Sequence, residues 1–488
     1  MMAALIADKM RPGMVLFSVV VLFLCVGILT PKEMLEGFSN KGMITVALLF
    51  LVSEGIRQSG TLGQVIKKLL PQGKTTVFKA QLRILPSVAF ISAFLNNTPV
   101  VVIFAPIIKH WAKSVKLPAT KFLIPLSYVT ILGGICTLIG TSTNLVVHGM
   151  ILEAGYEGFT MFELGKVGIF IAIAGIIYLF IFSKRLLPDA RPDTAVPDEE
   201  VEEGEKLHRV EAVLGARFPG INKKLSDFNF QRHYGAEVKE IKTRNGQRYV
   251  DHLEDVVLRE GDTLVVMADD TFIPTWGESS VFVLLTNGND PDTSGKKKRW
   301  LALILLVLMI VGATVGELPA TKEMFPDIKL DMFFFVCITT IIMAWTNIFP
   351  ARKYTKYISW DILITIACAF AISKAMVNSG VADCVAGFII GLSDDYGPHV
   401  LLAILFVITN LFTELITNNA AAALAFPLAL SISAQLGVSP TPFFVVICMA
   451  ASASFSTPIG YQTNLIVQGI GNYKFTDFVR IGLPLNIC

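Results

Sequence analysis

The chain has 488 residues, of which 53% are hydrophobic and 16% are charged, and its mean hydropathy is +0.61. Soluble globular domains carry about 25% charged residues, so this composition excludes an ordinary soluble protein and indicates an integral membrane protein. The net charge of +2 gives no electrostatic reason to expect a nucleic-acid partner.

Most of the sequence consists of apolar runs without charged residues, at lengths that suit a lipid bilayer. A membrane-spanning helix needs roughly 20 mainly apolar residues. The charge-free runs lie, in chain order, at 14–31, 84–108, 122–152, 167–183, 300–316 and 332–351, with shorter apolar stretches at 43–53 and 362–373. The longest run, 415–473, is rich in Asn, Thr, Ser, Pro and Gly, which is typical of broken helices that line a cavity.

A polar insert separates two membrane parts, because residues 184–299 hold 40 of the 80 charged side chains (41 basic plus 39 acidic). We expect an acidic flexible linker at 184–205, a small α/β domain at 206–285 and a polar return linker at 286–299. Apolar–polar alternation bounded by turn residues, among them Asn245-Gly246, predicts strands in this domain. The predicted strands are residues 209–214, 236–243 and 262–267.

The two membrane parts share polar motifs at a nearly constant distance along the chain. The pattern G-x-x-T-N-L-x-V-x-G occupies residues 140–149 and again residues 460–469, 320 positions later. The triplet Asn-Asn-Thr at 96–98 has the counterpart Thr-Asn-Asn at 417–419, 321 positions later. Single matches arise easily in apolar sequence, but several polar matches at one offset indicate an internal duplication.

Basic residues predict that the two repeats have opposite orientations. Lys and Arg gather on both sides of the run 84–108, so both flanks are cytoplasmic and the run enters and leaves the membrane on one side. The second triplet follows Asp394-Asp395, so its hairpin enters from outside. Lys184-Arg185 and the basic cluster at 296–299 place the insert, residues 184–299, in the cytoplasm.

The expected fold is therefore an α-helical polytopic membrane protein with two inverted repeats, each with a re-entrant hairpin and a broken helix, plus one small soluble α/β cytoplasmic domain. The first repeat spans 1–183, with its hairpin at 84–108 and its broken helix at 122–150, and the second spans 300–488, with a hairpin at 400–430 and a broken helix at 442–470. At the observed offset, the helices at 300–316 and 167–183 require partners before Met1 and from Phe478 onward. We therefore expect that this chain lacks one helix at its start and most of one helix at its end. The alternative is that this protein is simply shorter than its relatives.

The polar motifs form the expected transport site. Inverted-repeat transporters bind substrate and ions near the middle of the membrane, where half-helix ends and unwound backbone meet. Four segments are expected to converge, the hairpin tips 96–98 and 417–419 and the breaks 137–144 and 456–464. Their oxygen atoms suit Na⁺, and their helix N-termini suit an anion. Isolated Asn and Thr residues often only join membrane helices, but paired amide tips that occur twice favour binding.

With these tips and breaks, the sequence resembles the divalent anion/sodium symporter family of the ion transporter superfamily. That family has Ser-Asn-Thr motifs at two hairpin tips; here Asn97 and Asn418 keep the central Asn, while the flanking positions differ. The resemblance implies an anion site formed by Asn97, Thr98, Asn418, Asn419, Thr457 and Pro458. It implies two sodium sites, the first among Ser92, Asn96, Asn97 and the backbone near Thr137 and Gly140, and the second among Thr413, Thr417, Asn418 and the backbone near Ser456.

The insert resembles the C-terminal ligand-binding module of TrkA/RCK-type regulatory proteins between Arg209 and Asp270. The matching patterns are G-x-x-K-x-L from Gly220, Y-G-A-x-V from Tyr234 and L-x-x-G-D-T-L from Leu258. Symporters with this module resemble the sulfate-transporting branch of the family. The resemblance implies that the module binds a small molecule or nucleotide, or assists dimerisation.

The sequence thus predicts a sodium-coupled symporter of a divalent anion, sulfate, that works by alternating access as a homodimer in the plasma or inner membrane. Na⁺ is the expected co-transported ion. One alternative is a Na⁺- or H⁺-coupled dicarboxylate transporter, with Glu414 as a proton acceptor, and another is a ligand-gated channel or membrane sensor. An enzyme is not expected, because no nucleophile–base constellation or metal-ligand cluster appears in the membrane halves. The seven cysteines form no C-x-x-C pair and indicate neither a disulfide framework nor a metal site.

Overall fold

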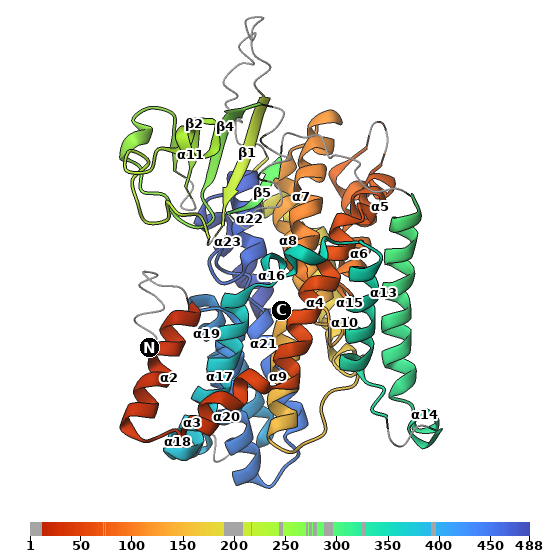
Figure 1. Ribbon diagram of the computed structural model, residues 1–488, viewed down its shortest axis with the longest axis vertical. Helices are drawn as coiled ribbons and strands as arrows, with labels where there is room; N and C mark the ends of the chain where they lie inside the picture. Colours follow the sequence, from red (N-terminus) through yellow and green to blue (C-terminus); the bar gives the residue numbers. More distant parts are fainter. Residues whose placement is uncertain are drawn as a thin grey trace, which may run out of the picture.

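The computed structural model shows a body of helices with a small β-sheet at one end (Figure 1). It describes residues 12–71, 73, 75–189, 208–215, 217–243, 247–269, 272, 276, 281–286, 296–324, 328–391 and 397–488. Within these ranges six helices are long and apolar enough to cross a membrane. They are Pro31–Gln58, Gly165–Leu186, Lys297–Gly316, Trp360–Asn378, Pro398–Leu415 and Asn418–Leu436. The predicted class, a helical polytopic membrane protein, is confirmed at this level.

Helices before the insert follow the apolar runs of the sequence. They are α2 (Pro12–Val26), α3 (Pro31–Glu36), α4 (Lys41–Gln58), α5 (Thr61–Leu69), α6 (Val77–Ser92), α7 (Asn97–Ser114), α8 (Leu123–Gly134), α9 (Ser142–Glu153) and α10 (Gly165–Leu186). The run 84–108 therefore covers two helices, α6 and α7, with a turn at 93–96 between them. The run 122–152 covers α8 and α9, which are separated by seven non-helical residues at 135–141.

The helices after the insert repeat this order. They are α13 (Lys296–Gly316), α14 (Pro319–Met324), α15 (Met332–Trp345), α16 (Tyr354–Tyr357), α17 (Trp360–Asn378), α18 (Val381–Gly391), α19 (Pro398–Leu415), α20 (Asn418–Leu436), α21 (Thr441–Ser452), α22 (Gln462–Gly471) and α23 (Phe475–Ile487). The run 415–473 thus divides into α20, α21 and α22, with a tight turn before α20 and a break at 453–461.

Pairs of helices pack in the same way in both halves. Helix α6 packs on α8 as α19 packs on α21. The helix that begins at each tip packs on the post-break helix of the other half, α7 on α22 and α20 on α9. The two halves are therefore interlocked, and the chain brings the tips and breaks of both halves to one region.

The insert forms a five-stranded antiparallel sheet with its own apolar core. Its strands are β1 (His208–Leu214), β2 (Glu237–Lys242), β3 (Arg248–Tyr249), β4 (Thr263–Ala268) and β5 (Phe282–Thr286), in the spatial order β3-β2-β4-β1-β5. Aromatic rings of Phe218, Phe228 and Tyr234, the last from helix α11 (Phe230–Tyr234), fill the core. Strands β1, β2 and β4 lie where the alternating pattern predicts strands, whereas the predicted Asn245-Gly246 turn lies outside the described residues.

The sheet contacts helices that lead into the membrane part. The Lys109 ammonium group at the far end of α7 lies 3.2 Å from both carboxylate oxygens of Glu211 in β1. On β2, Lys242 approaches the same carboxylate at 3.4 Å. At α22, a Cβ atom added to Gly469 would lie only 2.4 Å from the Thr263 hydroxyl of β4, so helix and sheet touch there. The sheet is therefore held against α7 and α22.

Candidate functional site

Each hairpin tip is fixed by a hydroxyl group one helix turn before it. In the first half the Ser92 hydroxyl is the donor available to both Oδ1 of Asn97, at 2.8 Å, and the carbonyl oxygen of Thr130, at 2.9 Å. One proton is shared among three oxygen atoms, so lone pairs remain for a cation. This contact orients the Asn97 amide, because its Oδ1 faces Ser92 and its Nδ2 then faces Tyr461 of the other half.

The second tip has the same arrangement. The Thr413 hydroxyl lies 2.9 Å from Oδ1 of Asn418 and 2.5 Å from the carbonyl oxygen of Ala451. These partners stand 321 positions after Ser92, Asn97 and Thr130. Both clusters are oxygen-rich and buried, with exposed fractions of 0% for Ser92, Asn97 and Thr413 and 9% for Asn418.

The two broken helices also carry matching hydrogen bonds. Nδ2 of Asn144 donates to the carbonyl oxygen of Thr137 at 2.9 Å, and Nδ2 of Asn464 donates to that of Thr457 at 3.1 Å. The backbone N–H of Gly140 donates to the Thr137 hydroxyl at 3.2 Å. A Cβ atom at Gly140 would lie 2.4 Å from a backbone carbonyl oxygen, so the break closes only around a glycine. Side chains thus satisfy backbone groups where the helix ladder is interrupted, as an apolar environment requires.

Each break is tied to the hairpin of its own half. The Thr137 hydroxyl donates to the carbonyl oxygen of Ala93, just before the first tip. The Thr457 hydroxyl donates to the carbonyl oxygen of Glu414 at 3.3 Å, just before the second tip. Gly460 donates its N–H to the Thr457 hydroxyl at 3.3 Å, in the same way as Gly140 does in the first half. The break and the hairpin of each half therefore form one connected unit.

The tips meet across the two halves at the hydroxyl group of Tyr461. Nδ2 of Asn97 donates to this hydroxyl at 2.5 Å, and the Thr141 hydroxyl lies 3.1 Å from it. The Thr98 hydroxyl donates to Oε1 of Gln462, the first residue of α22, at 3.4 Å. Sequence reasoning did not identify Tyr461, because the repeat pattern places Thr141 at the corresponding position and so shows no shared residue there.

The second tip makes the mirrored contact with the first half. The hydroxyl groups of Ser142 and Thr143, at the start of α9, each lie 3.3 Å from Oδ1 of Asn419. With the contacts of Tyr461, this brings together the N-termini of four helices, α7, α9, α20 and α22. Among the residues that the structure describes, no side chain caps the start of α9, α20 or α22.

Four helix starts give this region a positive potential without a cationic side chain. The first N–H groups of a helix have no partner within the helix, and the macrodipole places about half a positive charge there. The segments 93–98, 135–145, 416–419 and 453–464, all of which the structure describes, contain no charged residue. Such a site offers an anion dipoles and hydrogen bonds but no full positive charge.

Glu414 adds a negative charge beside the second break. Its carboxylate accepts hydrogen bonds from the backbone N–H groups of Ser456, at 2.8 Å, and Thr457, at 2.9 Å, and from Nδ2 of Asn486, at 2.9 Å. At the first break, Ala93 stands at the matching position and supplies no charge. The described residues place no cationic side chain within ion-pair distance of Glu414.

The predicted site residues fall into two groups. Ser92, Asn97, Thr413 and Asn418 share direct hydrogen bonds at the tips, and Thr137, Gly140 and Thr457 lie in the breaks beside them. The Ser456 hydroxyl accepts a hydrogen bond from Nδ2 of Asn486 at 2.8 Å and does not face the tip. The side chain of Thr417 is exposed and does not cap α20, and Pro458 is buried in the second break.

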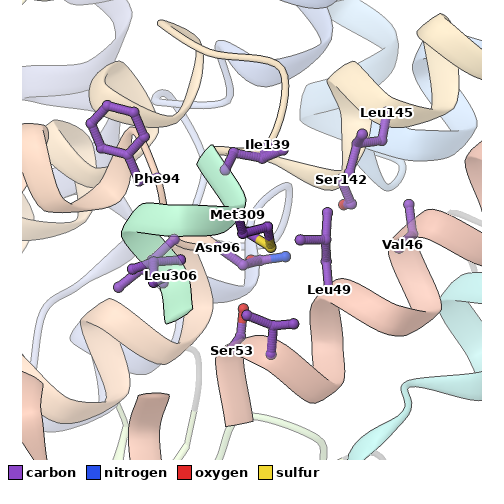
Figure 2. Close-up of a pocket in the computed structure, with 12 residues that line it drawn as sticks. Val46, Leu49, Ser53, Phe94, Asn96, Ile139, Ser142, Leu145, Leu306 and Met309 are labelled. Carbon is purple, nitrogen blue, oxygen red and sulfur yellow. The ribbon is translucent and has the colours of Figure 1, made fainter. Parts of the chain in front are cut away.

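A narrow pocket opens beside the first tip, between the hairpin and helices α4, α9 and α13 (Figure 2). Its polar groups are the side chains of Asn96, Ser53 and Ser142, and its other lining residues are apolar. Ser142 also contacts Asn419, so the pocket borders the region where the four helices begin. Asn96 therefore faces this pocket, whereas its neighbour Asn97 faces Tyr461.

Comparisons with known proteins point to transport. The family described as Citrate transporter matches residues 2–433 and, in a second match, residues 324–488. An uncharacterized transporter of Synechocystis sp. is 29% identical, over 96% of this chain and 90% of that protein. An uncharacterized transporter of Escherichia coli is 26% identical, over 98% of this chain and 94% of its own length. Sodium/sulfate cotransporter 2 of Chlamydomonas reinhardtii is 30% identical, over 57% of this chain and 31% of its own length.

Proposed function

Because the chain belongs to the citrate transporter family, a family of transporters and not of enzymes, we propose that it is a sodium-coupled symporter of a divalent anion, sulfate. The expectation that the protein is not an enzyme is confirmed by this membership. The choice of sulfate and of Na⁺ is supported by the similarity to proteins named sodium/sulfate cotransporters.

The meeting of four helix N-termini is the observation that carries the proposal. Each N-terminus stabilises an anion by about 0.3–1 kcal/mol, and by up to about 2 kcal/mol when partly buried. Four of them supply several kcal/mol, whereas taking an isolated charge out of water costs on the order of tens of kcal/mol. Dipoles alone are therefore too weak for a divalent anion, and bound cations close the gap. This balance is the physical reason for coupling to Na⁺.

The oxygen clusters at the two tips are the proposed cation sites. Na⁺ is a hard ion that prefers hydroxyl, amide and carbonyl oxygens, and each cluster has three such oxygens that share one proton. The first proposed site comprises Ser92, Asn96 and Asn97 with the backbone near Thr137 and Gly140, and the second comprises Thr413, Thr417 and Asn418 with the backbone near Ser456. When Na⁺ binds to the cluster, the hydroxyl group would keep its proton but rotate its O–H bond away from the other oxygen atoms, toward the anion or water.

The proposed anion site lies between the clusters. Asn97 and Thr98 begin α7, and Asn418 and Asn419 begin α20, whose first backbone N–H groups have no side-chain cap. Thr457 and Pro458 line it from the second break. Because the cations and the anion share Asn97 and Asn418, binding of one favours binding of the other, which is the thermodynamic requirement for symport.

We infer that the two halves are inverted repeats that exchange roles during alternating access. The tip and break hydrogen bonds recur at offsets of 320 and 321 residues, and α7 and α20 pack on each other's post-break partners. Two equivalent halves around one site permit two equivalent conformations, one open to each side of the membrane. We place the sheet domain, residues 206–285, in the cytoplasm of a plasma or inner membrane protein and propose that it is a TrkA/RCK-type module. A homodimer is part of the same proposal.

Uptake into proteoliposomes tests this function. The wild type is expected to accumulate radiolabelled sulfate only under an inward Na⁺ gradient. Asn97→Ala and Asn418→Ala each remove an oxygen of a proposed cation site and an amide donor of the anion site, so each is expected to abolish accumulation. Sulfate uptake that is equal with Na⁺ and with K⁺, or unchanged in both variants, would contradict the proposal.

Citrate or a dicarboxylate is the second candidate substrate, because the family is described as that of a citrate transporter. In that case the same sites would take a carboxylate anion, with Na⁺ or, through Glu414, a proton as the coupled ion. Parallel uptake of radiolabelled succinate and citrate, with a Na⁺ gradient and with a pH gradient alone, decides between the two substrates and between the two ions.

A further inference from the structure

The centre of the site breaks the symmetry of the two halves at one residue. At an offset of 320, Tyr461 before α22 corresponds to Thr141 before α9. The two side chains face each other, with their hydroxyl groups 3.1 Å apart. A phenol ring therefore occupies one side of a space whose other side is lined by a much smaller residue.

The ring fills space where an anion would lie. Its hydroxyl accepts a hydrogen bond from Nδ2 of Asn97 at 2.5 Å, and so reaches the first tip from the opposite half. The surrounding side chains are closed off from solvent, with exposed fractions of 0% for Asn97, 2% for Thr141, 9% for Asn418 and 8% for Tyr461 itself. Any anion held by both tips must therefore fit beside the phenol.

The hydroxyl group also restricts what can bind chemically. A buried amide donor that loses its acceptor is destabilising, so Asn97 keeps its bond to Tyr461 or exchanges it for an acceptor on the anion. The oxygen atoms of a compact tetrahedral anion are all acceptors, and such an anion can take the Asn97 amide and the Tyr461 hydroxyl together. An elongated anion needs more room beside the tips than a compact one, and the buried phenol ring occupies part of that room.

We propose that Tyr461 is the specificity-determining residue of the transport site: its phenol limits the site to a compact tetrahedral anion and excludes citrate and dicarboxylates. This inference rests on the proposed function, because it assumes that the anion binds between the tips. It deepens that function by naming the side chain that separates sulfate from the carboxylate substrates to which the family name refers.

Three variants separate the size of the ring from its hydroxyl group. Tyr461→Thr installs the residue that the other half already carries at Thr141 and removes the ring. Tyr461→Phe keeps the ring and removes the hydroxyl. Tyr156→Thr is the matched control, because Tyr156 is 44% exposed and touches Phe444 away from the tips.

The measurement is the ratio of initial uptake rates of radiolabelled sulfate and citrate under one inward Na⁺ gradient. Tyr461→Thr is expected to lower this ratio at least tenfold by admitting citrate, and Tyr156→Thr to leave it unchanged. Tyr461→Phe is expected to keep the ratio and to raise the KM for sulfate about tenfold, which corresponds to one lost hydrogen bond.

The outcomes for the inference and for the proposed function are distinct. Sulfate uptake by the wild type together with an unchanged ratio in Tyr461→Thr overturns the role of Tyr461 and leaves the function standing. Faster uptake of citrate than of sulfate by the wild type overturns the proposed substrate and the inference together. If Tyr461→Thr does not purify as a monodisperse protein, Tyr461→Leu, which is also smaller than the ring, is subjected to the same criterion.

Discussion

Glu414 shows how a single side chain makes two similar half-sites different. Its carboxylate caps the backbone N–H groups of Ser456 and Thr457, while Ala93 at the matching position of the first half leaves that cluster neutral. A fixed negative charge attracts cations and repels the anion. The two cation sites are therefore expected to differ in affinity, with the second site binding Na⁺ more tightly.

Replacing Glu414 by Gln is expected to raise the Na⁺ concentration for half-maximal uptake about tenfold, because removal of one charge weakens the nearby cation by roughly 1.4 kcal/mol. The Na⁺ dependence of sulfate uptake into proteoliposomes measures this shift. Glu54→Gln is the control, because Glu54 pairs with Arg57 on α4, at 2.6 Å, outside the tips and breaks. An unchanged Na⁺ curve accompanied by a lost response to pH would instead identify Glu414 as a proton acceptor.

The repeat pattern identified the tip residues but not the residue between the tips. Asn97, Asn418 and their neighbours stand out because they are polar, occur in pairs and lie in apolar runs, which is a property of the sequence itself. Tyr461 reaches the site only through packing between the two halves. It stands just before α22, and the fold places its hydroxyl group against Asn97, 364 positions away. No local pattern distinguishes it from an ordinary buried tyrosine.

The helical elements were predictable from charge-free runs because the bilayer imposes their length and polarity. The ends of the helices depend on finer features. Helix α7 begins at Asn97 because Oδ1 of Asn96 accepts from the N–H of Thr98, at 3.4 Å. Short helices such as α14 and α18 carry no comparable signal, because neither length nor charge separates them from the surrounding loops.

The breaks depend on glycines that admit close backbone contact. A Cβ atom at Gly140 would lie 2.4 Å from the carbonyl oxygen of Gly134 and 2.9 Å from that of Ala93. Gly140→Ala is therefore expected to push the break away from the hairpin and to reduce uptake more than tenfold. The comparison variant is Gly391→Ala at the end of α18, whose added Cβ meets no atom of the described residues within 4 Å.

Thermal unfolding in detergent and sulfate uptake should be measured for both glycine variants. The expected result is a lower midpoint and lost uptake for Gly140→Ala, with both quantities retained in Gly391→Ala. Equal behaviour of the two variants would show that the close contact in the break does not matter for folding or transport.

At the scale of the whole molecule, an ion pair joins the sheet to the membrane part. Burial alone would raise the pKa of Glu211, but Lys109 and Lys242 outweigh it and hold that pKa at about 2. A depressed carboxylate pKa stabilises the folded state above the unfolded value of 4.5, and the contribution is lost only as the pH falls through about 2. The junction is therefore expected to be insensitive to pH between about 5 and 8.

Removing the partner charge should loosen this junction. Lys109→Met is expected to remove the cation from α7 and to destabilise the docked sheet by about 2 kcal/mol, the size of one hydrogen bond between charged groups, because the pair is only partly buried and Lys242 stays beside Glu211. Hydrogen exchange of β1 measures the effect as faster exchange. The control is Lys239→Met on β2, because the Lys239 side chain is 52% exposed and pairs only with Glu237 of its own strand, among the contacts described. Equal exchange of β1 in both variants would show that the pair does not hold the sheet.

The sheet rests on α7 and α22, the same two helices that carry Asn97 and Asn464 into the transport site. Any displacement of these helices during a transport cycle displaces the sheet as well. A fluorophore on the sheet and a second one at the charged start of α13, beside Lys298, would therefore follow single turnovers from the aqueous side, with no dye placed in the membrane. The energy transfer between the two dyes would change at the rate of the transport cycle, and that rate would follow the ion gradient.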